Sequence, residues 1–115
     1  MVTLLDVIEH VPDVREPAVL DEAWRVLCPG GSLLVSTNTD RSVVEWKHDR
    51  HYSQERFRGL FVDRFHELRL VGLVPYFPTL RAWLGAPLVW RLFRDRLRPC
   101  DADEGQVVIG VGRKR

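Results

Sequence analysis

The sequence predicts an α/β fold built on a parallel sheet. A short apolar, β-prone run at residues 2–5 (VTLL) is followed by a helical pattern and then by a second apolar run at residues 32–37 (SLLVST). Strands that are joined through a helix run parallel in one sheet. The centre of the second run, from Leu33 to Val35, is continuous rather than alternating, which is typical of a strand covered by helices on both faces.

Two helices are predicted from apolar spacing and end signals. The first begins at Pro17, which suits a first helical turn, and ends at the CPGG sequence of residues 28–31, where a proline and two glycines let the chain reverse. The second follows a loop at residues 38–52 and can be capped by the Ser53 hydroxyl. Their apolar stripes contain Leu20, Ala23, Trp24 and Leu27 in the first helix, and Phe57, Leu60, Phe61 and Phe65 in the second.

The rest of the chain predicts two more strands and a helical segment. Residues 66–74 (HELRLVGLV) predict a strand, and residues 106–112 (QVVIGVG) predict the last one. Residues 79–97 predict two helical pieces separated at residues 85–87 (GAP). The apolar side chains and arginines of residues 80–97 would suit a membrane surface or a lipophilic substrate. The alternatives are a helix pair of the core with arginines reaching solvent, or apolar surface that meets a missing portion of the fold.

Length and composition indicate one small domain. The chain has 115 residues, 45% of them hydrophobic, and a formal charge of +1, which gives no electrostatic case for a nucleic-acid partner. The two cysteines, Cys28 and Cys100, have no metal or redox spacing and fit a reducing cytosol. The N-terminus lacks the pattern of a secretory signal, and the most apolar stretch, residues 77–93, is too short and too charged to span a bilayer. We therefore expect a cytoplasmic protein without an integral membrane segment.

A cluster of polar side chains follows the first predicted strand, in the sequence LLDVIEHVPD of residues 4–13. Asp6, Glu9 and His10 would lie just beyond the carboxyl end of that strand, where open α/β sheets bind ligands. Imidazole titrates near neutral pH, so His10 could act as a general base. The alternative is that Glu9 and His10 only cap the following turn through hydrogen bonds.

A second polar group is the HDRHY sequence of residues 48–52. Its side chains could contact a substrate, or Tyr52 could be packed and His51 bonded to backbone. His48 and His51 have a spacing that a metal could use, but no further ligands follow at zinc spacing, so we expect no metal. The end of the second strand adds polar side chains that could line the same pocket or form an ordinary turn: Thr37, Asn38 and Thr39.

Three segments in register carry a family resemblance. LLDVIEHVPD, RVLCPGGSLLVSTNT and HDRHYSQERFRGLF resemble class I S-adenosylmethionine-dependent methyltransferases, particularly the ubiquinone-biosynthesis-type branch that methylates small molecules. The likeness runs from Val2 to about Phe65, and the closing VVIGVGRKR is similar to the final strand of that family. It implies a seven-stranded Rossmann-like sheet with an antiparallel last strand. This chain would hold strands four to seven, as one partial domain over residues 1–115.

The resemblance also implies site residues and partners. It implies S-adenosylmethionine contacts at Leu5, Asp6, Val7 and His10, proton transfer by His10 or His51, and substrate contacts at Asn38, Arg50, His51 and Tyr52. The glycine-rich turn that holds this cofactor is absent, because the paired glycines at residues 30–31 follow a helix and precede a strand. The isolated chain is therefore expected to be incomplete or inactive, with a missing N-terminal half or a second copy as partner. The alternatives are a non-catalytic interaction module that pairs through the unpaired edge of residues 2–5, or a membrane-surface protein.

Overall fold

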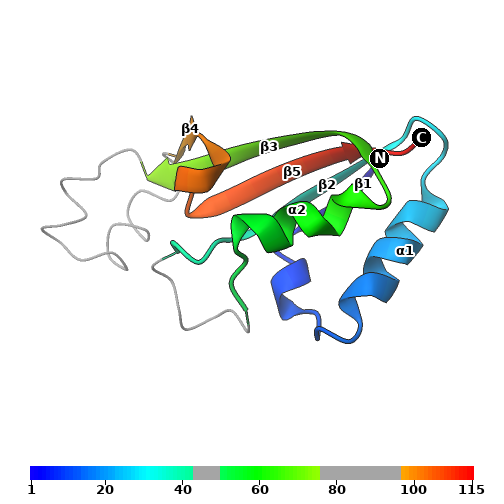
Figure 1. Cartoon of the computed structure of the whole chain (residues 1–115), viewed down its shortest axis with the longest axis horizontal. Coiled ribbons are helices and arrows are strands. Elements are labelled where there is room, and N and C mark those ends of the chain that lie inside the picture. The colour runs from blue at the N-terminus through cyan, green and yellow to red at the C-terminus, as the bar shows by residue number, and fades with distance from the viewer. Residues whose placement is uncertain (43–49, 76–96) are drawn as a thin grey trace, which may run out of the picture.

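The computed structural model describes residues 1–42, 50–75 and 97–115, which form a mixed five-stranded sheet with two α-helices (Figure 1). In chain order, the strands and α-helices are β1 (Val2–Leu5), α1 (Glu16–Val26), β2 (Ser32–Asn38), α2 (Gln54–Val62), β3 (His66–Pro75), β4 (Leu97–Cys100) and β5 (Val107–Arg113). Two short 3₁₀ turns lie between them, η1 (Ile8–His10) and η2 (Ala102–Glu104). The α/β class predicted from the sequence is therefore confirmed.

The strand order of the sheet is β1-β2-β5-β3-β4. β1 runs parallel to β2, as the strand, helix, strand pattern predicts. β5 lies between β2 and β3 and is antiparallel to both, so the last strand has the expected opposite direction. β1 occupies one edge of the sheet, and the carboxyl ends of β1 and β2 meet at the same side of it.

Helix ends follow the signals in the sequence. α1 begins one residue before Pro17, and the chain turns at residues 28–31 before β2. The Ser53 hydroxyl accepts a hydrogen bond from the backbone N–H of Arg56 at 3.2 Å, which satisfies one of the free donors at the start of α2. Both helices are therefore placed within about a residue of their predicted starts.

One strand was not predicted. Leu97 lies at the end of the predicted helical segment, but it begins β4, which pairs antiparallel with residues 72–75 of β3. The prediction of a helix is therefore wrong at Leu97, because pairing with a strand more than 20 residues earlier supplies hydrogen bonds that local spacing does not reveal. The remainder of that segment, residues 79–96, lies outside the described residues, as does the membrane-facing surface that it would carry.

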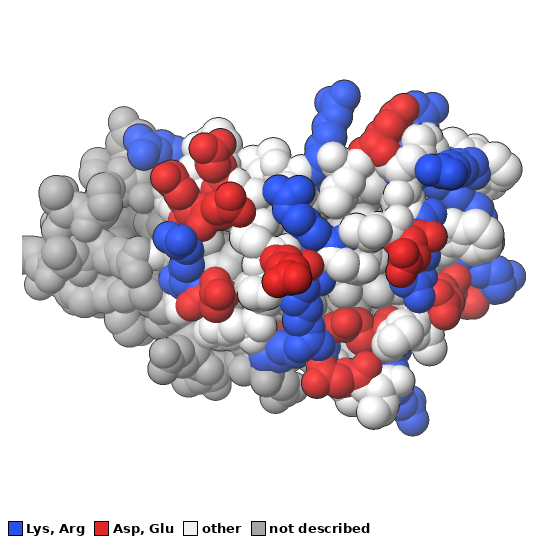
Figure 2. Space-filling view, in the orientation of Figure 1, with Lys and Arg blue, Asp and Glu red and all other residues white. Residues whose placement is uncertain are grey.

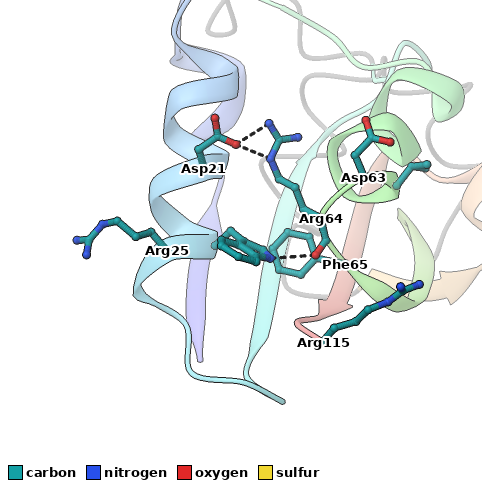
Figure 3. Close-up of a pocket in the computed structure, with 8 residues that line it drawn as sticks. Asp21, Arg25, Asp63, Arg64, Phe65 and Arg115 are labelled. Carbon is teal, nitrogen blue, oxygen red and sulfur yellow. Dashed lines mark hydrogen bonds and ion pairs between the residues drawn. The ribbon is translucent and has the colours of Figure 1, made fainter.

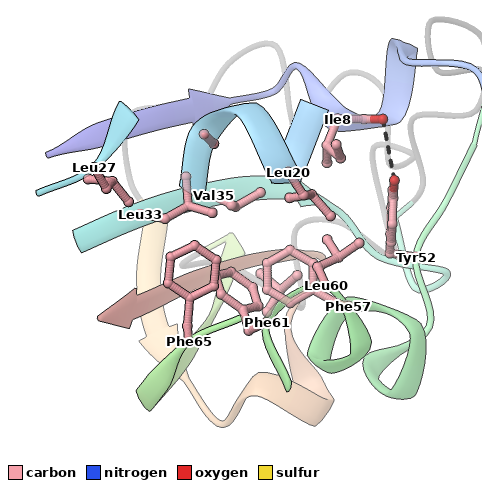
Figure 4. Packing of buried hydrophobic residues seen from close by; sticks show 12 residues of the cluster. Ile8, Leu20, Leu27, Leu33, Val35, Tyr52, Phe57, Leu60, Phe61 and Phe65 are labelled. Carbon is pink, nitrogen blue, oxygen red and sulfur yellow. Dashed lines mark hydrogen bonds between the residues drawn. The ribbon is translucent and has the colours of Figure 1, made fainter. Parts of the chain in front are cut away.

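The core lies on one face of the sheet, between the strands and both helices (Figure 4). Leu33 and Val35 of β2 face the side chains of α1 and α2. Opposite them in register, β5 carries Gly112 and Gly110, and the absence of a Cβ there lets the aromatic stripe of α2 approach the sheet. Phe57 and Phe61 are the buried aromatic residues of α2. Phe65, which the sequence predicted within the same helix, lies three residues beyond its end at Val62 but continues the aromatic row, with successive rings 5.6 and 5.9 Å apart between centroids.

The opposite face of the sheet carries apolar side chains that no described helix covers. Leu34 of β2, Val111 and Ile109 of β5 and Val71 of β3 share this face by register. The three residues of β2 and β5 are half-buried, whereas Val71 is 41% exposed. Leu5 of β1 lies on the same face and is 54% exposed. The sequence predicted helices on both faces of β2. Within the described chain, helices cover one face of this strand.

The surface carries charges of both signs. Figure 2 shows acidic and basic side chains interspersed over the face that it presents, in keeping with the net charge of +1. Neither of the two described α-helices is long and apolar enough to cross a membrane.

Candidate functional site

The chain leaves β1 through a backbone conformation that is unusual for a residue with a side chain. Asp6 has φ of +52°, in the left-handed region that aspartate tolerates better than most residues. Ser36 of the neighbouring strand holds it there. The Asp6 N–H donates to the Ser36 carbonyl at 3.1 Å and lies 3.2 Å from the Ser36 hydroxyl, and that hydroxyl donates to the Asp6 carboxylate at 3.0 Å. The loop after β1 therefore starts from a fixed point on the sheet.

This loop then forms η1 and one side of a pocket of about 300 Å³. Ile8 anchors η1 because its side chain is fully buried in the core, and Glu9 is also fully buried. His10 is exposed at the end of η1. The pocket lies at the carboxyl end of β1, the side of an open α/β sheet where ligands bind. Its lining residues are Glu9, His10, Val11, Pro12, Asp13 and Arg50.

Arg50 closes the other side of the pocket and binds the loop. Its guanidinium donates to the Ile8 carbonyl at 2.7 Å and to the Val11 carbonyl, and it forms ion pairs with Asp13 and Glu16. The Arg50 side chain is only 11% exposed, so these contacts are largely shielded from water. Arg50 therefore joins the β1 loop to the start of α1.

Tyr52 lies beneath this pocket, in the core. Its side chain is fully buried, and its hydroxyl contacts the Glu16 carboxylate and lies 3.3 Å from the Ile8 carbonyl (Figure 4). The guanidinium groups of Arg50 and Arg56 lie 5.2 and 5.1 Å from the centre of its ring. Arg56 also pairs with Asp13 at 2.7 Å, so these side chains form one network. We call Asp13, Glu16, Arg50, Tyr52 and Arg56 the arginine network.

Because the Tyr52 phenol is buried, the stability of the fold is expected to change with pH in the alkaline range. Burial, followed by the hydrogen bond to Glu16 and the charge of Glu16, raises the pKa of Tyr52 well above its usual range. The unfolded chain releases this proton near pH 10, whereas the folded chain retains it, so the contribution of Tyr52 is present below about pH 10 and is lost as pH rises. We expect the difference in free energy of unfolding between the wild type and Tyr52→Phe to shrink from about pH 9 to about pH 11 in urea titrations. A constant difference would contradict this assignment.

The structure brings the two polar groups of the sequence together. Residue 52 bridges to Thr39 just beyond β2, and the Tyr52 N–H donates to the Asn38 carbonyl at 3.1 Å. Asn38 is buried at the end of β2, and His51 is half-buried. Among the predicted site residues, His10 and Arg50 line the same pocket, whereas Asn38, His51 and Tyr52 are not among its lining residues. Leu5, Asp6 and Val7 are exposed and also lie outside the lining of the pocket. His48 lies outside the described residues.

A larger groove lies elsewhere, between α1 and α2 (Figure 3). It has a volume of about 700 Å³ and is crossed by the ion pair of Arg64 with Asp21 and by the hydrogen bond from the Trp24 indole to the Arg64 carbonyl, at 3.0 Å. Arg115 also lines it, next to the end of β5 that pairs with the start of β2. This groove is therefore at the amino end of β2, away from the polar loops, and we place the candidate site at the smaller pocket.

Three residues that organise the site were not predicted as part of it: Ser36, Glu16 and Arg56. Asp13 belongs to the polar loop of residues 4–13, but no role was predicted for it. Asp13 and Glu16 resemble ordinary acidic residues near a helix N-terminus, and Arg56 resembles a solvent-facing residue of α2. Their partners are 30 to 43 positions away in the chain, so sequence spacing carries no signal for them. Across the described residues, no three His, Cys, Asp or Glu side chains gather to hold a metal ion.

Comparison with known proteins gives a likeness of fold to solved structures. No protein-family model matches the sequence, and no curated protein matches it. A solved structure that does match is a SAM-dependent methyltransferase from Thermotoga maritima, a possible histamine N-methyltransferase, with a TM-score of 0.67 and 23% sequence identity. The match covers 98% of this chain and 55% of that one, so this chain spans about half the length of the methyltransferase. Over that length, the chain has the α/β fold of an S-adenosylmethionine-dependent methyltransferase.

Proposed function

We propose that the chain takes part in S-adenosylmethionine-dependent methyl transfer to a small molecule, in an enzyme of the ubiquinone-biosynthesis type that its motifs resemble. The observation that supports this best is the order β1-β2-β5-β3, in which β5 is antiparallel to both of its neighbours, with the LLDVIEHVPD loop at the carboxyl end of β1. In this proposal, β1, β2, β3 and β5 correspond to strands four, five, six and seven of the methyltransferase sheet.

The loop after β1 has the chemistry of one wall of a cofactor pocket. Leu5 and Val7 are 54% and 42% exposed, on either side of the Asp6 carboxylate. These residues offer apolar contact area next to a charged acceptor, as a nucleoside with ribose hydroxyls requires. The left-handed Asp6 is already fixed by Ser36, so this wall needs no reordering on binding. S-adenosylmethionine, when bound, supplies an electrophilic methyl group on a sulfonium.

His10 and His51 are the proposed proton acceptors. His10 is exposed in the pocket, and its imidazole can take the proton that a substrate hydroxyl releases when it is methylated. The proposed substrate contacts are Asn38 and His51. Arg50 and Tyr52, which the sequence also suggested as contacts, have their polar groups engaged within the protein, so we propose that they support the wall of the pocket. Positioning of the acceptor in line with the methyl group would supply most of the rate enhancement.

The described residues do not supply the rest of the cofactor site. Among them, no glycine-rich turn follows a strand and opens a helix, and the space beside Gly31, Gly72, Gly105, Gly110 and Gly112 is filled by atoms of the protein itself. In the described chain, the outer edge of β1 has no neighbouring strand, and the opposite face of the sheet has exposed apolar side chains. We propose that an N-terminal half of the fold supplies the glycine-rich turn, pairs with β1 and covers this face.

An S-adenosylmethionine titration followed by ¹H–¹⁵N NMR tests this function. We expect weak binding, with a Kd of about 1 mM because half of the site is missing, and chemical-shift changes confined to the amides of Leu5 to His10. Asp6→Ala should abolish these changes, whereas the control Asp63→Ala, an exposed carboxylate at the end of α2, should retain them. No change in the loop at millimolar cofactor would overturn the proposed function, and tight stoichiometric binding would overturn the claim that half of the site is missing.

The exposed edge of β1 and the uncovered apolar face also favour a second candidate, a non-catalytic module that dimerises or binds another protein. Light scattering on the NMR sample separates the two. A stable dimer whose loop does not respond to S-adenosylmethionine would favour the interaction module, whereas a monomer with the loop response would favour the methyltransferase.

A further inference from the structure

The β1 loop is too short to hold its own shape. η1 has three residues, and a single 3₁₀ turn has few internal hydrogen bonds and free carbonyls at its end. Within it, the His10 N–H donates to the Val7 carbonyl at 3.0 Å and the Val11 N–H donates to the Ile8 carbonyl at 3.2 Å. Ser36 fixes the entrance of the loop at Asp6, four residues before His10. The exit of the loop needs a second anchor.

Arg50 is placed to be that anchor. One of its terminal nitrogens reaches the carbonyls of Ile8 and Val11, which are the first residue of η1 and the residue just after it. The other terminal nitrogen pairs with Asp13, farther along the loop. A guanidinium can bridge such separated acceptors because its N–H groups point in fixed directions, which an ammonium cannot reproduce. A single side chain therefore spans the loop from Ile8 to Asp13.

The Arg50 guanidinium is itself held in place by Glu16 and Tyr52. Glu16 lies 3.3 Å from it, and the Glu16 side chain is only 13% exposed. The Tyr52 ring packs against the same group, and Tyr52 in turn contacts Glu16 through its hydroxyl. Arg56 shares both carboxylates of the network and balances their charge. Both terminal nitrogens of Arg50 are thus engaged within the protein.

We infer that Arg50 is a positioning residue, which holds the β1 loop so that His10 faces the pocket. This inference rests on the proposed function, since it concerns the wall of that same site. Arg50 acts through the backbone of residues 8–13 rather than by giving its terminal nitrogens to a substrate. The wall is thereby formed before any ligand arrives, which reduces the conformational entropy lost on binding.

The test compares Arg50→Met with Arg64→Met in the whole 115-residue chain. Arg64 is a matched control because it is a partly buried arginine, with 24% side-chain exposure, whose ion pair with Asp21 joins α1 to α2 without touching residues 6–13. Hydrogen exchange is measured for the hydrogen-bonded amides of His10 and Val11 and for those of β5, and the His10 imidazole signals are followed by ¹H–¹³C NMR. We expect Arg50→Met to speed exchange in the loop relative to β5 by about tenfold, and Arg64→Met to leave that ratio unchanged.

The His10 signals give a readout that general destabilisation would not move. In Arg50→Met they should shift toward the values of an unstructured peptide, and in Arg64→Met they should stay in place. Arg50→Lys keeps the positive charge, and we expect it to loosen the loop as Arg50→Met does, because one ammonium cannot engage the carbonyls of Ile8 and Val11 and the Asp13 carboxylate at the same time. The inference would be overturned if both Arg50 variants showed the same loop exchange and the same His10 signals as Arg64→Met. None of these measurements uses S-adenosylmethionine, so they fail or succeed independently of the titration that tests the proposed function.

Discussion

Gly110→Val should lower the free energy of unfolding by about 3 kcal/mol, at the upper end of what overpacking a core costs. A Cβ on Gly110 would lie 2.8 Å from ring carbons of both Phe57 and Phe61, where ordinary contacts begin near 3.4 Å. Both rings are fully buried and pack edge to face on each other, so neither can move without disturbing its neighbour. The strand preference of valine is worth at most about 1 kcal/mol, which is too little to offset these contacts.

Gly59→Ala is the matched control, and its expected effect has the opposite sign. Gly59 lies in the middle of α2, and a Cβ there would meet nothing within 4 Å. Alanine should therefore raise the free energy of unfolding by about 0.5 to 1 kcal/mol, through its higher helix propensity. Urea titrations followed by circular dichroism measure both variants. Equal effects of the two substitutions would show that α2 does not pack on β5 as described.

The elements that could be predicted are those whose signals are local. Pro17 and the glycines of residues 28–31 bound α1, and the Ser53 cap marks the start of α2, because each acts on backbone groups within a few residues. The apolar run of β2 indicates a buried strand without any knowledge of which strands pair with it. β4 carries no such signal. Its sequence, LRPC, includes a proline and an arginine, and it becomes a strand only by pairing with β3.

The site could be predicted in part for the same reason. A polar loop after a buried strand marks the carboxyl end of the sheet, so the position of Asp6 and His10 just beyond β1 could be predicted from the sequence. The left-handed backbone of Asp6 could not, because it depends on Ser36, 30 positions away. The arginine network is also long-range, and each of its charged members has an ordinary local explanation at a helix end or on a helix surface. What sequence reasoning missed is the set of residues that hold the loop, rather than the loop itself.

Lys114, the residue after β5, provides the second large effect. It is only 9% exposed, which is unusual for a lysine. The ammonium donates to the carbonyls of Trp24 and Leu27 at 2.7 Å each, and it lies 3.8 Å from the centre of the Trp24 indole. These carbonyls belong to the last turn of α1 and the residue that follows, where the helix provides no backbone donors and the helix dipole favours a cation.

Lys114→Met should therefore lower the free energy of unfolding by about 3 kcal/mol, because it leaves two carbonyls without their charged donor and removes the cation–π contact. Methionine keeps the apolar stem, and the backbone bonds between residue 114 and residues 30–31 remain, so the loss measures the ammonium group. The matched control is Arg113→Met. Its guanidinium also donates to a carbonyl, that of Gly30 at 3.2 Å, but is 52% exposed, and we expect a loss below about 1 kcal/mol. If both variants unfold at the same urea concentration, the ammonium of Lys114 does not hold the end of α1, and the packing of α1 on the sheet must suffice alone.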